Sequence, residues 1–125
     1  MKETYRQRDL LLKQLGFSNY LAYLHSPLWS AIRRKAFATH GSTCLTCSNR
    51  ADAVHHLSYS RSTLLGFRID LLAPICSDCH EKVEFTNRGR KRQVHEVQKT
   101  YKALRRKVYS TRKAQSKGSN RSRNQ

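Results

Sequence analysis

The sequence predicts one small α+β domain, in which helices flank a short metal-binding region that contains a strand. Three observations predict this class. Apolar residues recur at helical spacing near both ends of the 125-residue chain. Two Cys-x-x-Cys pairs enclose its middle. Between them, residues 53–57 read Ala-Val-His-His-Leu, a composition typical of a short strand.

Residues 1–40 are expected to form the N-terminal helical part of the domain. A leucine-rich stretch ends at Gly16, a residue suited to follow a helix C-terminus. Ser26 and Pro27 then supply an N-cap and a first helical residue for a second helix. The residues after them share one apolar face at helical spacing: Trp29, Ile32, Ala36 and Phe37. We expect the Trp29 face to pack inward.

Residues 41–87 are expected to fold around a metal ion. Four thiolates can close one tetrahedral structural zinc site, and the chain offers four, Cys44, Cys47, Cys76 and Cys79. Two disulfides are the alternative, but the paired spacing in a reducing compartment favours metal ligation. A turn is expected over 61–66. A short polar helix should begin near Asp78 and carry His80 and Glu84.

Residues 88–109 should form a basic amphipathic helix. One apolar seam recurs at steps of three and four residues along it: Val94, Val97, Tyr101, Leu104 and Val108. We expect this seam to dock on the N-terminal helices, with a homodimer seam as the alternative. Residues 110–125 contain no acidic residue and are expected to form a disordered basic tail.

The charge of the chain indicates its class of partner. Lys and Arg number 25 against 8 Asp and Glu, which gives a formal charge of +17. Such an excess, spread along the chain, favours a polyanion such as DNA or RNA, on whose bases Trp29 could alternatively stack. No apolar run approaches the ~20 residues of a membrane span, and the N-terminus has no signal-peptide pattern. We therefore expect a cytoplasmic protein with no membrane partner.

Three histidines lie among the cysteine pairs although the four thiolates already satisfy a structural zinc. They are His55, His56 and His80. Phosphodiester cleavage needs a general base, a Lewis acid and cations that absorb the developing charge. Because successive side chains of a strand point to opposite faces, His55 and His56 should divide these tasks, one binding metal and the other activating water.

The order of these motifs resembles the HNH nuclease family. The resemblance is carried by the first cysteine pair, by residues 54–61 (Val-His-His-Leu-Ser-Tyr-Ser-Arg) and by residues 72–80 (Leu-Ala-Pro-Ile-Cys-Ser-Asp-Cys-His). It covers roughly residues 41–85. It implies a ββα-metal core, also called a His-Me finger, in which a hairpin and a helix surround one divalent ion. The implied activity is metal-dependent hydrolysis of DNA phosphodiester bonds.

The resemblance also implies roles for single residues. His56 would be the general base with an ordinary pKa near ~6.5, and His55 and His80 would hold a catalytic ion such as Mg²⁺, Mn²⁺, Ni²⁺ or Zn²⁺. Arg61 would contact phosphate, as could Lys82 and Arg68. The alternative, an ordinary surface charge, is open for Arg61 and is favoured for Lys82 and Arg68.

The chain departs from the family pattern at three positions. The Asn that usually fixes the loop carrying the base is replaced by Leu71, with Asp70 before it. Many relatives have a further histidine where this chain has Glu84, which either ligates the ion or faces solvent. The acidic residue of a Gly-x-Glu stretch is replaced by Arg68.

Three classes of function stay open at this stage. The first is a metal-dependent DNA endonuclease of a bacterial or phage-like setting, acting as a monomer or homodimer. The second is a catalytically silent, zinc-stabilised nucleic-acid-binding protein, and the third is a structural component of a nucleoprotein assembly. Three further histidines, His25, His40 and His95, receive no role.

Overall fold

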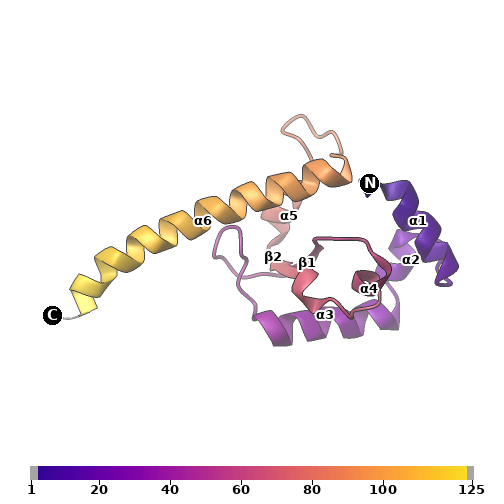
Figure 1. Cartoon of the computed structure of the whole chain (residues 1–125), viewed down its shortest axis with the longest axis horizontal. Helices are drawn as coiled ribbons and strands as arrows, with labels where there is room; N and C mark the ends of the chain where they lie inside the picture. Colours follow the sequence, from indigo (N-terminus) through magenta and orange to yellow (C-terminus); the bar gives the residue numbers. More distant parts are fainter. Residues whose placement is uncertain (1–2, 124–125) are drawn as a thin grey trace.

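The computed structural model of the chain describes the backbone of residues 3–123 and the side chains of residues 3–108. It is a mixed α+β structure with one two-stranded sheet (Figure 1). Its elements, in chain order, are α1 (Tyr5–Gln14), α2 (Tyr20–Leu24), α3 (Pro27–His40), β1 (Ala53–His56), α4 (Arg61–Leu64), a 3₁₀ helix (Ile69–Leu71), β2 (Leu72–Ile75), α5 (Ser77–Glu84) and α6 (Val94–Arg123).

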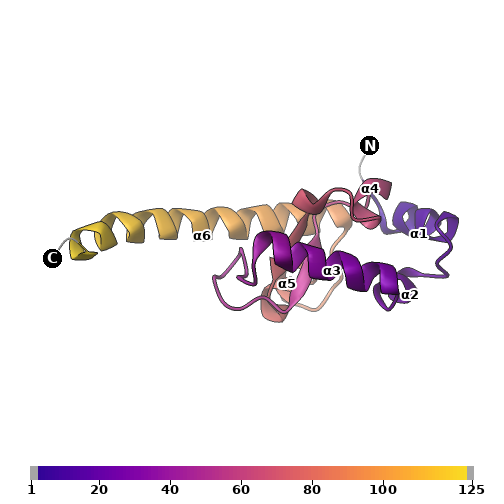
Figure 2. The ribbon, with the colours of Figure 1, turned by 90° about the horizontal axis from the view of Figure 1, so that it is seen from below.

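The small sheet lies at the centre of the body. Strands β1 and β2 pair antiparallel, with His55 opposite Ala73 and His56 opposite Leu72. Helix α3 packs against β2, and α5 contacts β1 and α6. The helices α1 and α2 stand at one end of the body, and α6 extends from it toward the C-terminus (Figures 1 and 2). The sheet therefore presents its histidine pair between two helical layers.

The starts of the N-terminal helices follow from their capping residues. The Thr4 side chain accepts from the Gln7 backbone in a capping box at the start of α1. Ser26 accepts from the backbone of Trp29, and Pro27 occupies the first turn of α3. Gly16 adopts a φ of 98°, which ends the first helix where the sequence predicted a break. The predicted caps of α3 are confirmed.

Two hydrophobic clusters hold the body together. The larger joins the N-terminal helices to both strands and includes Leu12, Tyr23, Trp29, Ile32 and Leu72. The inward packing of the Trp29 face is confirmed, since Trp29 is buried at 7% exposure. The smaller cluster consists mostly of small residues around the cysteines: Cys44, Ala51, Ala73, Ile75, Cys79, Val83, Val97 and Tyr101. Its apolar area is limited, so a metal held by the four cysteines would add to the stability of this half of the molecule.

Helix α6 differs from its predicted surroundings and bounds. Val97 and Tyr101 are buried in the smaller cluster beside Val83, so the seam docks mainly on the cysteine-rich side. Only Val94 joins the cluster of the N-terminal helices. The backbone stays helical to Arg123, where the sequence predicted a helix to 109 and a disordered tail. Ala, Gln, Lys and Arg in this stretch favour helix, and no proline interrupts it.

The segment over 61–66 also differs from the expected turn. Residues Arg61–Leu64 form the short helix α4, which the Ser60 side chain caps by accepting from Thr63. The Ser60 cap was the sequence signal for it, but four residues are too few to show a helical period.

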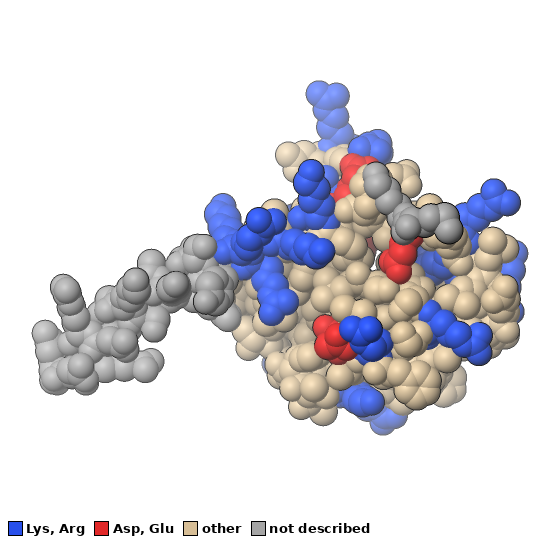
Figure 3. Space-filling model, in the orientation of Figure 1, with Lys and Arg blue, Asp and Glu red and all other residues tan. Residues whose placement is uncertain are grey.

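On the face of the molecule in Figure 3, basic side chains prevail over acidic ones and gather at the point at which α6 leaves the body. Exposed residues there include Lys102, Arg105 and Arg106. Within residues 3–123, no helix combines the length and the apolar character that crossing a membrane requires. The surface charge agrees with the excess of basic residues in the sequence.

Gly66 is expected to be intolerant of substitution. Its φ is 85°, and an added Cβ would lie 2.8 Å from Ile32 Cγ1. Gly66→Ala should therefore combine backbone strain with overpacking and lower the free energy of unfolding by about 2–4 kcal/mol. Denaturant unfolding measures this loss. Gly16→Ala is the matched control, because Gly16 ends a helix with the same pattern of backbone hydrogen bonds and a φ of 98°, but a Cβ there meets no atom within 4 Å. A cost equal to that of Gly66→Ala would contradict the packing argument.

Candidate metal centre and its pocket

The four cysteines converge from two distant segments, the loop after α3 and the start of α5. All four are free, and their Sγ atoms lie within 4.8 Å of one another. The Sγ atoms of Cys47 and Cys76 are 3.6 Å apart. Zn–S bonds of 2.3 Å in a tetrahedron place sulfurs about 3.8 Å apart, so the cluster fits a zinc ion. The cysteine pairs thus form a site that could hold a structural metal.

A second group of ligands lies beside the cysteines and is separate from them. His55 on β1 and His80 and Glu84 on α5 bring ligand atoms within 4.8 Å of one another. Glu84 Oε1 lies 3.4 Å from His80 Nε2 and 3.9 Å from His55 Nδ1. Glu84 therefore points toward both histidines, whereas the sequence left open whether it faces solvent.

Gln98 of α6 determines which nitrogen of His55 carries the proton. The Gln98 amide nitrogen donates to the His56 carbonyl at 2.8 Å, so its oxygen is the atom 2.9 Å from His55 Nε2. An amide oxygen can only accept, and His55 Nε2 must therefore be protonated. The other nitrogen, Nδ1, is left with a lone pair directed toward the Glu84 carboxylate.

This arrangement leaves two acceptors facing each other inside the protein. His55 Nδ1 is buried and has no hydrogen-bond partner among the described residues. Burial lowers the pKa of His55 to about 4, so the ring is neutral at pH 7 and cannot donate to Glu84 from Nδ1. An unsatisfied buried acceptor beside a carboxylate is costly unless a cation lies between them. The donor set of two imidazoles and one carboxylate fits a divalent transition metal better than Mg²⁺, which prefers oxygen ligands.

Gln98 was missed by sequence reasoning, although it is a polar residue next to the apolar seam of α6. Because outer partners of metal ligands fix their orientation, Gln98→Leu should weaken Mn²⁺ binding about 10- to 100-fold. Calorimetric titration of Mn²⁺ into zinc-loaded protein measures this. Gln93→Leu removes an exposed amide just before the same helix and should leave the affinity unchanged; equal affinities in both variants would contradict the role of Gln98.

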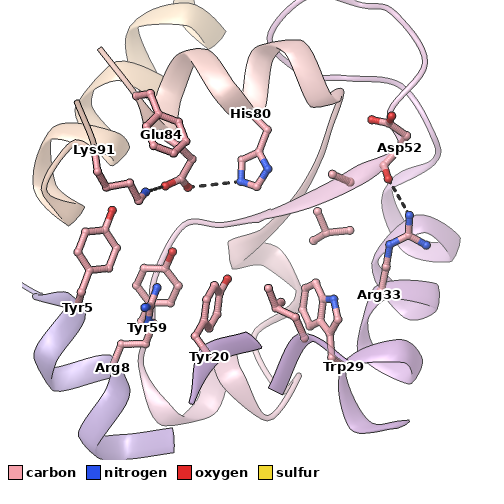
Figure 4. A pocket seen from close by; sticks show the side chains of 14 residues that line it. Tyr5, Arg8, Tyr20, Trp29, Arg33, Asp52, Tyr59, His80, Glu84 and Lys91 are labelled. Atoms are coloured by element: carbon pink, nitrogen blue, oxygen red, sulfur yellow. Dashed lines mark hydrogen bonds and ion pairs between the residues drawn. The ribbon is translucent and has the colours of Figure 1, made fainter. Parts of the chain in front are cut away.

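His80 and Glu84 face a pocket of about 580 Å³. Figure 4 shows them on one wall, with Tyr5, Tyr59, Tyr20 and Trp29 along the opposite wall. The other side chains that line the pocket include three cations and one carboxylate: Arg8, Arg33, Lys91 and Asp52. His55 is fully buried behind the wall. An ion held by the three ligands would thus be reachable from the pocket by water and substrate, as in catalytic sites.

His56 lies on the other side of the strand, as the strand geometry predicted. Its ring stacks on Trp29 at 4.7 Å and on Tyr59 at 5.4 Å between centroids, and it is 2% exposed. Tyr20 Oη lies 3.2 Å from His56 Nδ1, while His56 Nε2 has no partner among the described residues. Burial lowers the pKa of His56 to about 3, so the expected ordinary value near 6.5 is wrong for this structure. The Tyr20 hydroxyl gives His56 a polar contact with a residue that lines the pocket.

The wall opposite His80 and Glu84 includes three phenols that stay protonated. Burial raises the pKa of Tyr20 to about 12 and raises that of Tyr59 as well. The hydroxyl groups of Tyr5, Tyr20 and Tyr59 point toward His80 and Glu84 (Figure 4). The Tyr5 hydroxyl donates to the Arg92 carbonyl at 2.9 Å, and the Arg8 guanidinium lies over all three rings.

The cations that the resemblance nominated lie elsewhere. Arg61 is exposed at the start of α4, and Lys82 is exposed on α5; neither lines the pocket beside His80. Arg68 also lies outside that pocket and is paired with Asp70 through two bonds of 2.8 and 3.0 Å. The structure does not bring these three residues to the candidate metal centre.

The loop after the histidine pair is held although the family's asparagine is missing. The Leu71 carbonyl accepts from the Leu57 backbone at 2.8 Å. The Glu3 carboxylate accepts from Ser58 Oγ and from the Tyr59 backbone. Backbone pairing and a residue from the N-terminus therefore fix this loop. Among the other histidines, His40 contacts the Ile69 carbonyl at 2.7 Å, while His25 and His95 are exposed.

Comparisons with protein-family models, with curated proteins and with solved structures found no match.

Proposed function

We propose that the protein is a metal-dependent endonuclease of the HNH type that hydrolyses DNA phosphodiester bonds. The observation that carries the proposal is the buried Nδ1 lone pair of His55, which faces the Glu84 carboxylate beside His80 at the edge of a pocket. A divalent cation would satisfy all three ligands there and remain accessible to substrate.

The order of the elements supports a ββα-metal core. The antiparallel strands β1 and β2 are followed by α5, and the three ligands come from β1 and α5. The four cysteines close a separate cluster, so the second group of ligands is free for chemistry. DNA and the reducing conditions that keep thiols free occur together inside the cell, so the proposal includes a cytoplasmic location.

A bound divalent ion would supply Lewis-acid stabilisation of the phosphate and of the leaving oxygen. His55, His80 and Glu84 would hold the ion, with Gln98 fixing the His55 ring. The general base is assigned to His56, which contacts the pocket through the Tyr20 hydroxyl at 3.2 Å. A base can act through one intervening group when that group is within hydrogen-bond reach of both sites.

The burial of His56 favours a second candidate function. A base of pKa about 3 without direct access to water is weak, and a protein with this site could bind nucleic acid without cutting it. The basic surface would still supply affinity for a phosphate backbone, RNA included. The two candidates differ in whether added divalent ions produce cleavage.

The test is incubation of the purified protein with supercoiled plasmid and Mg²⁺, Mn²⁺, Ni²⁺ or Zn²⁺. We expect nicked or linear products with at least one ion. His80→Ala should lose more than about 100-fold of this cleavage, because one of three ligands of the ion is removed. His95→Ala, which removes an exposed histidine of α6, is the control and should cleave as the wild type does. Retardation of the plasmid without cleavage by any ion would support the binding-only function instead.

A further inference from the structure

Two cations that line the pocket lie over the ring of the same tyrosine, Tyr5. The Arg8 guanidinium lies 4.9 Å from the centre of the Tyr5 ring, and Lys91 Nζ lies 4.8 Å from the same centre. Arg8 comes from α1, and Lys91 from the loop between α5 and α6. Both line the pocket with His80 and Glu84, as Figure 4 shows. Segments far apart in the sequence thus bring two positive charges to one end of the pocket.

Arg8 is held in place by its surroundings. Its guanidinium lies 3.9 Å from the centre of the Tyr20 ring and 5.1 Å from that of Tyr59, in addition to Tyr5. Nε donates to Asp9 Oδ1 at 3.0 Å, and the side chain is 12% exposed. This bond uses one of the five N–H donors of the group. An arginine fixed by aromatic faces loses little conformational entropy when its remaining donors bind an anion.

Lys91 is placed by the backbone. An isolated bridge pairs it with Phe85, the residue that follows α5, and its ammonium donates to the Glu84 carboxylate. Lys91 remains 43% exposed and can therefore reach a ligand in the pocket. Glu84 directs its Oε1 atom toward the histidines and its Oε2 atom toward Lys91, so the lysine adjoins the candidate metal centre without being one of its ligands.

We propose that Arg8 and Lys91 form a clamp for one phosphate of a nucleic-acid strand, next to the phosphate that lies at His80 and Glu84. This inference rests on the proposed function and names the residues that hold its substrate. Two cations that line one pocket, 4.9 and 4.8 Å from the same ring centre, suit an anion with several oxygen acceptors, and phosphate is the anion that repeats along a nucleic acid. The N-terminal helix is then part of the binding site.

In this proposal Arg8 and Lys91 take the phosphate-binding role that the resemblance to HNH nucleases gave to other cations. Arg61, Lys82 and Arg68 are exposed and do not line the pocket. Arg33, the third cation of the pocket, donates to the Asp52 carbonyl at 2.7 Å and lies toward the far end of the pocket from Tyr5 (Figure 4). Arg8 and Lys91 are therefore the cations that share one aromatic residue and one end of the pocket.

The test measures binding and does not depend on cleavage. Fluorescence anisotropy would follow a labelled single-stranded oligonucleotide with phosphorothioate linkages, over a range of salt concentrations and without added divalent ion. Lys91→Gln and Arg8→Gln should each weaken binding about tenfold. Each should also reduce the dependence of log affinity on log salt by about 0.7. The matched controls are Lys35→Gln and Arg34→Gln, which remove exposed cations of α3 outside the pocket.

The double variant separates one shared phosphate from two independent contacts. If both cations hold one phosphate, the losses of Arg8→Gln and Lys91→Gln should not add. Because Arg8 also contacts three tyrosines, its variant requires a melting temperature and the fluorescence of Trp29, the one tryptophan of the chain. Lys91 is exposed but pairs with Glu84 and lies over the Tyr5 ring, so its variant takes the same two measurements.

The clamp is overturned if Lys91→Gln binds with the affinity and salt dependence of Lys35→Gln. That result would leave the nuclease proposal standing when plasmid is still cleaved in a His80-dependent manner. Conversely, clamp-dependent binding without cleavage by any metal would reject the nuclease and retain the phosphate site.

Discussion

Removal of the structural metal is expected to unfold the cysteine-rich half of the protein. The smaller hydrophobic cluster contains two cysteines and two alanines among its eight buried residues. Structural zinc contributes about 10–16 kcal/mol of apparent binding free energy in small zinc domains, which equals or exceeds the ~5–15 kcal/mol that stabilises a typical domain. Without an ion, we expect these small apolar residues to be too few to hold the loop after α3 against the start of α5.

Cys79→Ser and prolonged treatment with a chelator should have the same effect. Cys79 is 5% exposed and its Sγ belongs to the four-sulfur cluster. We expect the melting transition to broaden and fall, with loss of amide protection over residues 41–87. The α1–α3 region should retain partial protection, because its own cluster includes Leu12, Tyr23 and Ile32. Hydrogen exchange read out by mass spectrometry distinguishes the two halves.

The control for this experiment is Ser42→Ala, a change of an exposed residue in the same loop as Cys44. It should leave both zinc content and melting temperature unchanged. Retention of the wild-type melting temperature by metal-free protein would reject a structural metal, as would a zinc content well below one ion per chain. Readdition of Zn²⁺ should restore the fold, since ligand binding to the native state stabilises it.

The sequence was sufficient for the features that local chemistry specifies. Ser26 and Pro27 determine the start of α3 because a hydroxyl cap and a fixed φ act within one turn. The spacing of the cysteines and of the helical apolar face likewise needs no distant information. The opposite directions of His55 and His56 followed from the alternation of a strand.

Features that depend on distant contacts were not predictable. Gln98 meets His55 across 43 residues, and no local pattern separates it from other polar residues of α6. Arg8 reaches the pocket because α1 folds back toward Tyr59, which a helix assignment alone cannot show. The pKa expected for His56 was also wrong. The residues that bury its ring, such as Trp29 and Tyr20, come from the N-terminal helices, far from His56 in the sequence.

Substitution of His56 is expected to lower both stability and cleavage, because this side chain is packed in the core and is also the proposed general base. The ring is buried among Trp29, Tyr20, Tyr23 and Tyr59. His56→Ala should leave a ring-sized cavity and lower the free energy of unfolding by about 2–4 kcal/mol. If His56 is also the general base, metal-supported cleavage should fall about 10²- to 10⁴-fold under conditions in which the variant is still folded.

Added small molecules can separate the two effects. A buried cavity of this kind binds a ligand of matching shape, and imidazole and pyrrole both fit the volume of the lost ring. Pyrrole has no basic nitrogen, whereas imidazole does. Both should raise the melting temperature of His56→Ala, because either one fills the cavity, but imidazole alone should restore cleavage if a basic nitrogen is needed beside the Tyr20 hydroxyl.

Tyr20→Phe tests whether the buried His56 ring acts on the pocket through the Tyr20 hydroxyl. It removes the hydroxyl 3.2 Å from His56 Nδ1 and keeps the aromatic face under Arg8. If the proton passes through this hydroxyl, Tyr20→Phe should lose nearly as much cleavage as His56→Ala and retain most of the stability. Equal rescue of His56→Ala by pyrrole and imidazole, together with full activity of Tyr20→Phe, would assign His56 to packing alone and require another base.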